Sequence, residues 1–181
     1  MKKLLLILLC VPLIGFGQQT YVPDDNFEQA LINMGYDNVL DNYVQTSNIN
    51  MVTNLNVNSQ NISDLTGVED FTALWDLRCD TNQLTSLDVS NTTALTNLFC
   101  GINQLTTIDV SDSTSLNQLQ CNNNNLTVIN LGSGITISGF LLQATGNPGM
   151  VIKVGSAARV TLANSVFIPG TNFDVGTTIT I

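Results

Sequence analysis

The sequence contains no histidine, and only 10% of its residues are charged. Without an imidazole the chain lacks Ser–His and Cys–His nucleophilic systems, and we therefore predict a protein that is not an enzyme. Acidic residues outnumber basic ones 14 to 5, so the net charge is −9. This charge argues against nucleic acid and against anionic membrane surfaces as partners. The sequence gains its polarity from Asn, Thr, Ser and Gln instead.

Long apolar runs are also lacking, apart from one at the start of the chain. Residues 4–16 are apolar and follow the basic pair Lys2 and Lys3. The small residues around 15–17 resemble a cleavage site, so we expect a signal peptide over 1–17 and a mature chain that begins at Gln18. The run is too short for a transmembrane segment, and no other segment is long enough. We expect a protein that is exported, and either secreted or at the cell surface.

Cysteine occurs four times, and its first position lies in this apolar segment. Cys10 could be read as a lipid attachment site, which would make the protein a lipoprotein. The bulky Leu9 before it and the apolar residues after it favour a simple export signal. The other three cysteines recur at a fixed interval, inside a repeat.

The repeat has a step of 21 residues, and its three regular copies begin at Leu74, Leu95 and Leu116. A fourth copy begins at Val52 and is one residue longer. The shared pattern is L-x-x-L-x-C-x-x-N-x-L-x-x-L-x-V. Its alternating apolar positions predict one short strand per copy, and stacked copies would form a parallel sheet. The repeats are expected over 51–131, with turns or extended segments rather than helices on the outer side.

Equivalent residues of successive copies would form ladders inside such a stack. The cysteines, Cys79, Cys100 and Cys121, are predicted to be buried as small apolar residues. A disulfide is an alternative in an exported chain, but in-register strands point their Cβ atoms the same way. A metal site is disfavoured because there is no histidine and no C-x-x-C spacing. The asparagines, Asn82, Asn103 and Asn124, are predicted to bond backbone groups where the chain turns.

A solenoid needs caps at both ends of its core. Over residues 18–50 the pair Asp25 and Glu28 fits a capping box, and we predict a short helix over 25–34 that seals the first repeat. Asp37, Asn38 and Asp41 could bind Ca²⁺, but they lack the order of a calcium-binding loop, and turn residues are the favoured interpretation.

The pattern decays over residues 132–181, where Gly, Thr and β-branched residues dominate. Ile137, Phe140 and Leu142 keep the 21-residue step, which predicts one degenerate copy. Short strands are expected around 135–137, 151–154, 160–162 and 179–181, in an irregular β-rich C-terminal cap. The apolar final stretch also fits a chain that is a truncated piece of a longer protein.

The N-terminal cap followed by cysteine-bearing repeats resembles secreted bacterial leucine-rich-repeat surface proteins of the internalin-like kind, over roughly 21–131. The resemblance implies an α/β leucine-rich-repeat solenoid with a parallel β-sheet. It also implies a non-enzymatic module that binds or adheres, and it implies no cofactor and no metal. Many such proteins carry a C-terminal sorting or anchoring domain, which is not recognised here.

In such repeats the exposed strand positions line a concave face. Trp75, Arg78, Phe99 and Ile102 fall together there, and exposed aromatics beside an arginine are typical of a binding hot spot. We therefore predict a monomer that binds a protein or glycan ligand through this face. A structural spacer in a larger surface protein is the alternative.

Two other functions have less support in the sequence. A row of threonines, Thr85, Thr106 and Thr127, would suit ice or mineral binding, but strands carry threonine by propensity alone. A carboxylate-pair hydrolase is disfavoured because Asp88 and Asp109 recur in the repeat as turn residues.

Overall fold

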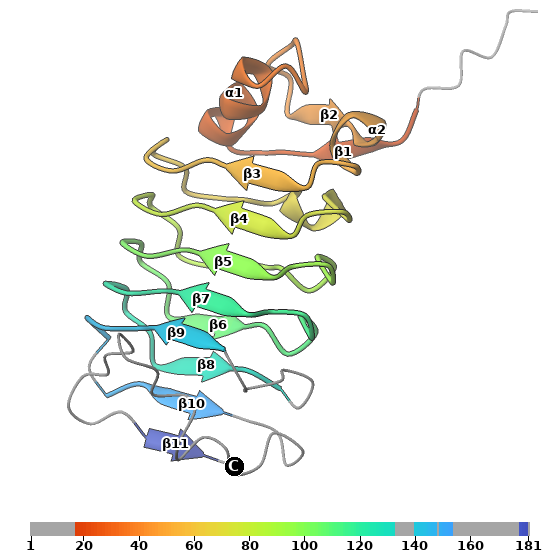
Figure 1. Cartoon of the computed structure of the whole chain (residues 1–181). Coiled ribbons are helices and arrows are strands. Elements are labelled where there is room, and N and C mark those ends of the chain that lie inside the picture. Colours follow the sequence, from red (N-terminus) through yellow and green to blue (C-terminus); the bar gives the residue numbers. More distant parts are fainter. Residues whose placement is uncertain (1–16, 133–139, 148, 154–177, 181) are drawn as a thin grey trace, which may run out of the picture.

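The computed structural model describes residues 17–132, 140–147, 149–153 and 178–180, and it shows a parallel-sheet solenoid of leucine-rich-repeat type (Figure 1). One wall is a five-stranded sheet in the order β3-β4-β5-β7-β9. All its neighbours pair in parallel. The strands are β3 (Asn54–Asn56), β4 (Asp76–Arg78), β5 (Asn97–Phe99), β7 (Gln118–Gln120) and β9 (Leu141–Gln143).

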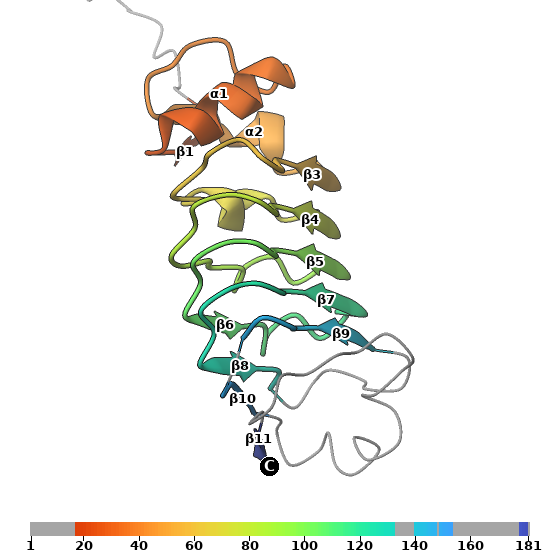
Figure 2. The same ribbon diagram turned by 90° about the vertical axis from the view of Figure 1, so that its left-hand side faces the viewer.

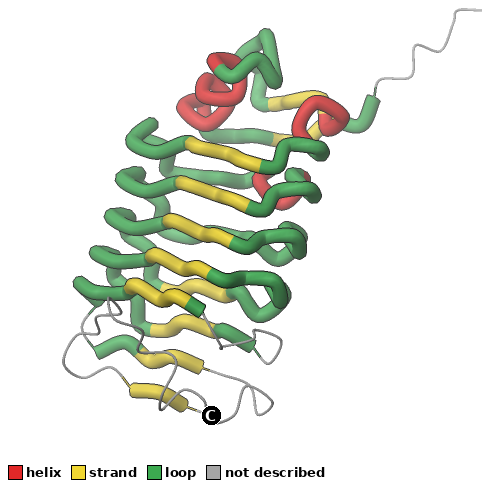
Figure 3. Tube along the Cα trace, viewed as in Figure 1, coloured by secondary structure: helices red, strands yellow, loops and turns green. Residues whose placement is uncertain are grey.

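The opposite wall is a second parallel sheet, in the order β11-β10-β8-β6 (Figure 2). Its strands are β6 (Thr107–Asp109), β8 (Val128–Asn130), β10 (Val151–Lys153) and β11 (Thr178–Thr180). Within the described repeats the outer side carries one helical turn, the 3₁₀ helix η1 (Val68–Asp70), as Figure 3 shows. The predicted fold class and the mostly non-helical outer side are therefore confirmed. The repeat length predicts turns or extended segments there, and the structure shows in addition that these segments pair into a sheet.

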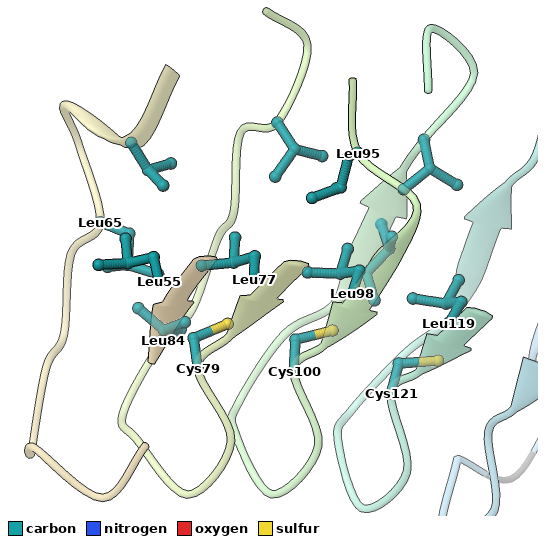
Figure 4. Close-up of a cluster of buried hydrophobic side chains, with 14 of the residues drawn as sticks. Leu55, Leu65, Leu77, Cys79, Leu84, Leu95, Leu98, Cys100, Leu119 and Cys121 are labelled. Carbon is teal, nitrogen blue, oxygen red and sulfur yellow. The ribbon is translucent and has the colours of Figure 1, made fainter. Parts of the chain in front are cut away.

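The core lies between the two walls and consists of ladders of identical positions (Figure 4). The middle residues of the first wall's strands stand in register and are buried: Leu55, Leu77, Leu98, Leu119 and Leu142. The three cysteines form the next ladder, each with no exposed surface. They are free thiols, and their sulfur atoms point the same way along the ladder. This arrangement is the one that in-register parallel strands impose, and it leaves no geometry for a disulfide between neighbours.

A row of buried asparagines joins each repeat to the one before it. In Asn103 the side-chain nitrogen donates to the carbonyls of Cys79 and Cys100, at 3.0 and 3.2 Å, and Oδ1 accepts from the amide of Leu84 at 3.0 Å. Asn82 and Asn124 bond in the same way. These amides satisfy the buried backbone groups that each turn leaves without a strand partner.

A fourth asparagine continues this row where the sequence analysis did not place it. Asn147 donates to the carbonyls of Cys121 and Ala144 and accepts from the amide of Leu126. Leu142 pairs with Leu119, so the step is 23 residues rather than 21. The predicted degenerate copy therefore exists, but its predicted register was wrong. Strand pairing and the asparagine decide the register, and Phe140 is buried one residue before the strand.

The N-terminal cap consists of β1 (Gln19–Tyr21), α1 (Asp25–Asn33), β2 (Tyr43–Gln45) and α2 (Thr46–Ile49). Strands β1 and β2 pair antiparallel. Helix α1 buries Phe27, Ala30 and Leu31 over the first repeat, as predicted. In the described part of the chain no helix is long and apolar enough to cross a membrane.

The predicted capping box was wrong by one residue. Asp24 is the N-cap, and its Oδ1 accepts from the amides of Asn26 and Phe27. Its Oδ2 accepts from the amide and hydroxyl of Ser63, at 2.8 and 2.7 Å, which ties the cap to the first repeat. Glu28 does not reach back to the N-cap. Its buried carboxylate accepts from the backbone amides of residues 41–43 instead.

Some of the remaining predictions fall on residues that the structure describes, and others do not. Predicted strands near 151–154 and 179–181 correspond to β10 and β11. The predicted strands at 135–137 and 160–162, the signal peptide and Cys10 lie outside the described residues.

We expect Asn103→Ala to lower the free energy of unfolding by about 2–3 kcal/mol, because several buried backbone groups lose their partner at once. The matched control is Gln104→Ala at the exposed neighbouring position, with an expected change below about 0.5 kcal/mol. Urea unfolding of both variants gives the comparison. Equal changes would contradict a structural role for the asparagine row.

The hydrogen bonds of the Asp24 carboxylate predict that the free energy of unfolding depends on pH. Burial raises the pKa of its carboxyl, but the hydrogen bonds from Ser63, Phe27 and Asp64 outweigh this and hold the pKa below its ordinary value of 3.8. The stability that the carboxylate contributes is therefore present above pH 3.8 and is lost as the pH falls through the lower, folded-state pKa. We expect the stability difference between the wild type and Asp24→Asn, measured by urea unfolding, to shrink as the pH falls below about 4. A difference that stays constant at low pH would contradict this assignment.

Candidate functional site: the exposed face of the five-stranded sheet

The predicted binding residues lie on the solvent side of the five-stranded sheet. Trp75 and Ile102 are 41% and 51% exposed, which is unusual for large apolar side chains. Arg78 on β4 stands directly beside Phe99 on β5, because the two residues are register partners. The fold therefore brings all four predicted residues to two neighbouring repeats. We call this set (Trp75, Arg78, Phe99 and Ile102) the aromatic patch.

Arg78 is held rigidly within the aromatic patch. Its Nε donates to Oδ1 of Asp76 at 2.8 Å, and its Nη2 donates to Oδ2 at 3.3 Å. Its guanidinium carbon lies 4.7 Å from the centre of the Phe99 ring. The hydrogen bond with Asp76 raises the pKa of the guanidinium further above its ordinary value. A two-point bond and a stacked ring limit the rotamers of this side chain, so it would lose little entropy on binding.

Asp76 occupies one of the strand positions that the repeat pattern predicts to be exposed. It is only 4% exposed, because Arg78 and Asn97 cover it and donate hydrogen bonds to it. The Asp76–Arg78 pair is neutral as a unit, so this part of the face carries less positive charge than the sequence suggests.

A row of left-handed residues borders the face, at the turn that follows each strand. The φ angles are 57°, 57°, 52° and 54° at Ser59, Thr81, Ile102 and Asn123, and 75° at Gly146. This conformation suits glycine and asparagine, and it is unfavourable for β-branched side chains. Thr81 and Ile102, which are both β-branched, are therefore strained, whereas Asn123 and Gly146 suit the same turn position one and two strands further along.

At Gly101, the residue before Ile102, the mismatch between residue type and backbone conformation is reversed. Gly101 occupies a position where the other repeats have Asn58, Asp80, Asn122 and Thr145, and its φ is not left-handed. The backbone thus has glycine where it needs none, and isoleucine where glycine or asparagine would relieve strain. In the last described copy Thr145 comes first and Gly146 follows, so that the glycine occupies the left-handed position.

Gly101 is buried, and two side-chain oxygens lie close to it. A Cβ placed on it would lie 3.0 Å from Oδ1 of Asn122 and 3.1 Å from Oδ1 of Asp80. The same Asp80 oxygen accepts from the Gly101 amide at 2.7 Å. Burial raises the pKa of the Asp80 carboxyl, and this effect outweighs its hydrogen bonds and the nearby Arg78. A side chain at position 101 would therefore require Asp80 and Asn122 to move by a few tenths of an ångström.

The other potentially reactive groups among the described residues are the buried thiols and the carboxylates of the repeat turns. Burial raises the pKa of the thiols of Cys79, Cys100 and Cys121, so they stay protonated and inert. Asp88 and Asp109 accept from the amides of Ser90 and Ser111, as turn residues do.

The candidates for metal and mineral binding are Asp37, Asn38 and Asp41 and the threonine row, and of these Asp37 has one buried oxygen, Oδ2, without a hydrogen-bond partner. Asp41 accepts from the amide of Tyr43 in a turn. Among the described residues no group of three His, Cys, Asp or Glu side chains is placed to hold a metal ion. The exposed threonines Thr85, Thr106 and Thr127 lie on successive turns, and the hydroxyl of Thr127 donates to the carbonyl of Thr106.

Comparison with solved structures places the fold among internalins. One similar structure is the functional domain of InlJ from Listeria monocytogenes, which includes a cysteine ladder; the TM-score is 0.57 and the identity 23%, over 91% of this chain and 44% of that one. Another is the internalin InlF from Listeria monocytogenes strain 4b F2365, with a TM-score of 0.55 and 23% identity, over 81% of this chain and 48% of that one. The chain thus spans less than half the length of these two structures.

Sequence comparison adds no closer relationship. No protein-family model matches the chain, and no curated protein is significantly similar. The similarity to internalins therefore shows a leucine-rich-repeat fold, and the function must be argued from the exposed face.

We expect Ile102→Asn to be more stable than Ile102→Ala by about 1 kcal/mol. Both variants lose the apolar side chain, but only asparagine is suited to the left-handed backbone of this turn. Thermal unfolding of the two variants isolates the strain from the loss of apolar contacts. Equal stability would show that the isoleucine is not strained.

Proposed function

We propose that this protein is an exported, non-enzymatic leucine-rich-repeat module that binds a protein or glycan partner outside the cell. The aromatic patch, on the face predicted to be concave, forms the centre of the binding surface. Residues 18–50 and 132–181 serve as caps, and 51–131 present the face. The chain acts as a monomer and takes no cofactor, metal or nucleic acid.

The observation that carries this proposal is the preorganised Arg78. Surface arginines usually sample many rotamers, whereas this one is bonded to Asp76 and stacked on Phe99. Aromatic residues and arginine dominate binding hot spots because they offer a large contact area at low entropic cost. The strain at Ile102 adds support, since unfavourable backbone conformations are often retained where a side chain is needed for function.

The alternative is a structural spacer within a longer surface protein, as the incomplete coverage of the internalin structures would allow. A spacer needs no particular side chains on its exposed face. Its regular polar positions, such as Asn54, Asn56 and Asn117, would suffice for solubility. The spacer function does not account for an arginine that is bonded to Asp76 and stacked on Phe99, so the binding function is preferred.

We expect the double variant Trp75→Ala/Phe99→Ala to lose binding to a partner selected from a panel of extracellular matrix proteins and polysaccharides. A loss of at least about tenfold in affinity is expected if the patch is a hot spot. Trp75 is the only tryptophan, so its emission reports on binding directly, and saturable changes are expected with one ligand class.

The matched control is Thr85→Ala/Thr106→Ala, which alters exposed side chains away from the aromatic patch. Unchanged circular dichroism and melting temperature would show that both variants fold. If no member of the panel produces a saturable change, or if the patch variant binds like the wild type, the spacer function replaces the binding function.

A further inference from the structure

A hollow lies where the N-terminal cap meets the first repeat, beside the exposed face of the five-stranded sheet. The cap lies over β3 (Figure 1), and the hollow is lined by residues from both: Tyr36, Asn48, Met51, Val52, Thr53 and Asn54. Its volume of about 470 Å³ falls within the range of small-molecule sites, roughly 300–1,000 Å³. We call it the cap hollow.

The lining of the cap hollow is uncharged, and its polar groups have spare hydrogen-bonding capacity. Asn48 donates to the carbonyl of Tyr36 at 2.9 Å, and its Oδ1 accepts nothing from the described residues. Within the same part of the chain, the side chain of Asn54 makes one long contact, 3.4 Å, with the hydroxyl of Thr53. The hydroxyl of Tyr36 makes no hydrogen bond to a described residue. Amides and hydroxyls both donate and accept, so they suit a ligand that carries several hydroxyl groups.

Apolar surface adjoins these polar groups. Met51 is 78% exposed, the largest value among the large apolar side chains that the structure describes. Tyr36 is partly buried against the core. Trp75 is 41% exposed and lies one strand along, because its backbone amide donates to the carbonyl of Thr53 at 2.9 Å. A flexible thioether and aromatic rings offer contact area to C–H groups. A ligand that combines hydroxyl groups with C–H faces has the chemistry of a sugar ring.

A row of uncharged residues leads from the cap hollow across the sheet. Thr53, Trp75, Thr96 and Asn117 precede successive strands, and each donates its backbone amide to the carbonyl of the one before it, from Trp75 onwards. Neighbouring strands are about 4.8 Å apart, so the row is continuous. The carboxylate of Asp80 follows β4 and thus lies at the other end of the strand. The row offers an aromatic platform with polar side chains on both sides, as a linear chain of sugar units requires.

The distribution of charge favours a neutral ligand in the cap hollow. On the neighbouring face the guanidinium of Arg78 is paired with Asp76 at 2.8 Å. A second hollow, of about 410 Å³ at the opposite wall, is lined by the carboxylates Asp88, Asp109 and Asp112. A cationic ligand would be attracted to those carboxylates, and an anionic one would be repelled by the net charge of −9. An uncharged ligand matches the uncharged lining.

We propose that the cap hollow and the row beside it bind a neutral oligosaccharide, with one sugar unit against Tyr36 and Asn54 and the next stacked on Trp75. This inference rests on the proposed function and narrows it, because it assigns a glycan rather than a protein to the face. It also accounts for the exposure of Met51 and Trp75, which the packing of the repeat does not require.

The test uses the full chain labelled with ¹⁵N and three neutral probes: maltotetraose, mannotetraose and N-acetylchitotetraose. At least one of them is expected to shift the backbone amides of Thr53 and Asn54 saturably and to change the emission of Trp75 over the same concentrations. The anionic probe tetragalacturonate should cause neither effect. If all three neutral probes fail up to about 10 mM, or if tetragalacturonate binds as tightly as they do, the proposal is overturned.

Variants locate the binding within the cap hollow. Asn54→Ala should weaken binding of the neutral probe about five- to tenfold, since it removes hydrogen bonds, and Trp75→Ala at least about tenfold. The matched control is Asn91→Ala, which alters an exposed asparagine outside the cap hollow and should bind like the wild type. Unchanged circular dichroism would show that all three fold. Equal binding by Asn54→Ala and Asn91→Ala would overturn the assignment to the cap hollow.

A second arm separates this inference from the proposed function. A glycoprotein partner found in the panel of matrix proteins and polysaccharides should lose binding when its glycans are removed enzymatically. If a protein without glycans binds, and Trp75→Ala/Phe99→Ala abolishes that binding while the neutral probes shift no amide, the binding face stands and the glycan assignment is overturned. If neither proteins nor oligosaccharides bind, the proposed function itself fails.

Discussion

The structure depends on one recurrent interaction, the buried asparagine amide that bonds two repeats at once. Each three-residue strand is too short to fix its own place in a sheet, and the turn after it buries polar backbone groups. Asn82, Asn103, Asn124 and Asn147 satisfy these groups with hydrogen bonds to their own repeat and to the preceding one. The leucine and cysteine ladders can pack in register only because this bonding holds the repeats at a constant spacing.

Because the repeats are so regular, a residue that differs from its equivalents is informative. Equivalent residues of neighbouring repeats share the same backbone conformation, so their side chains can be compared directly. Asparagine and glycine occupy the left-handed turn at Asn123 and Gly146, which shows what the backbone prefers there. Thr81 and Ile102 depart from that preference with β-branched side chains. Ile102 is half exposed and belongs to the repeat whose Phe99 stands in register with Arg78, so the more apolar of the two departures falls in the aromatic patch.

Much of the fold could be predicted from the sequence because the repeat encodes it directly. Leu77, Leu98 and Leu119 recur at one interval, and each lies in register in the sheet. The register failed where that interval changed: the step from Leu119 to Leu142 is longer, and Asn147 showed the correct alignment only once its bonds were known. The N-cap was misplaced for a similar reason, since Asp24 and Asp25 are equally good caps by type, and only the contact of Asp24 with Ser63 distinguishes them.

By itself, the sequence determined the repeat, the solenoid, the buried cysteines and the exposed positions of Trp75 and Ile102, because periodic burial is a local property of the pattern. Tertiary structure alone decided that the outer segments pair into a second sheet and that Asp76 is buried beneath Arg78. It also decided that Asp80 and Asn122 pack so closely on Gly101 that a side chain there would displace them. These features arise between neighbouring repeats, where side chains about twenty residues apart come into contact, and no property of a single repeat specifies them.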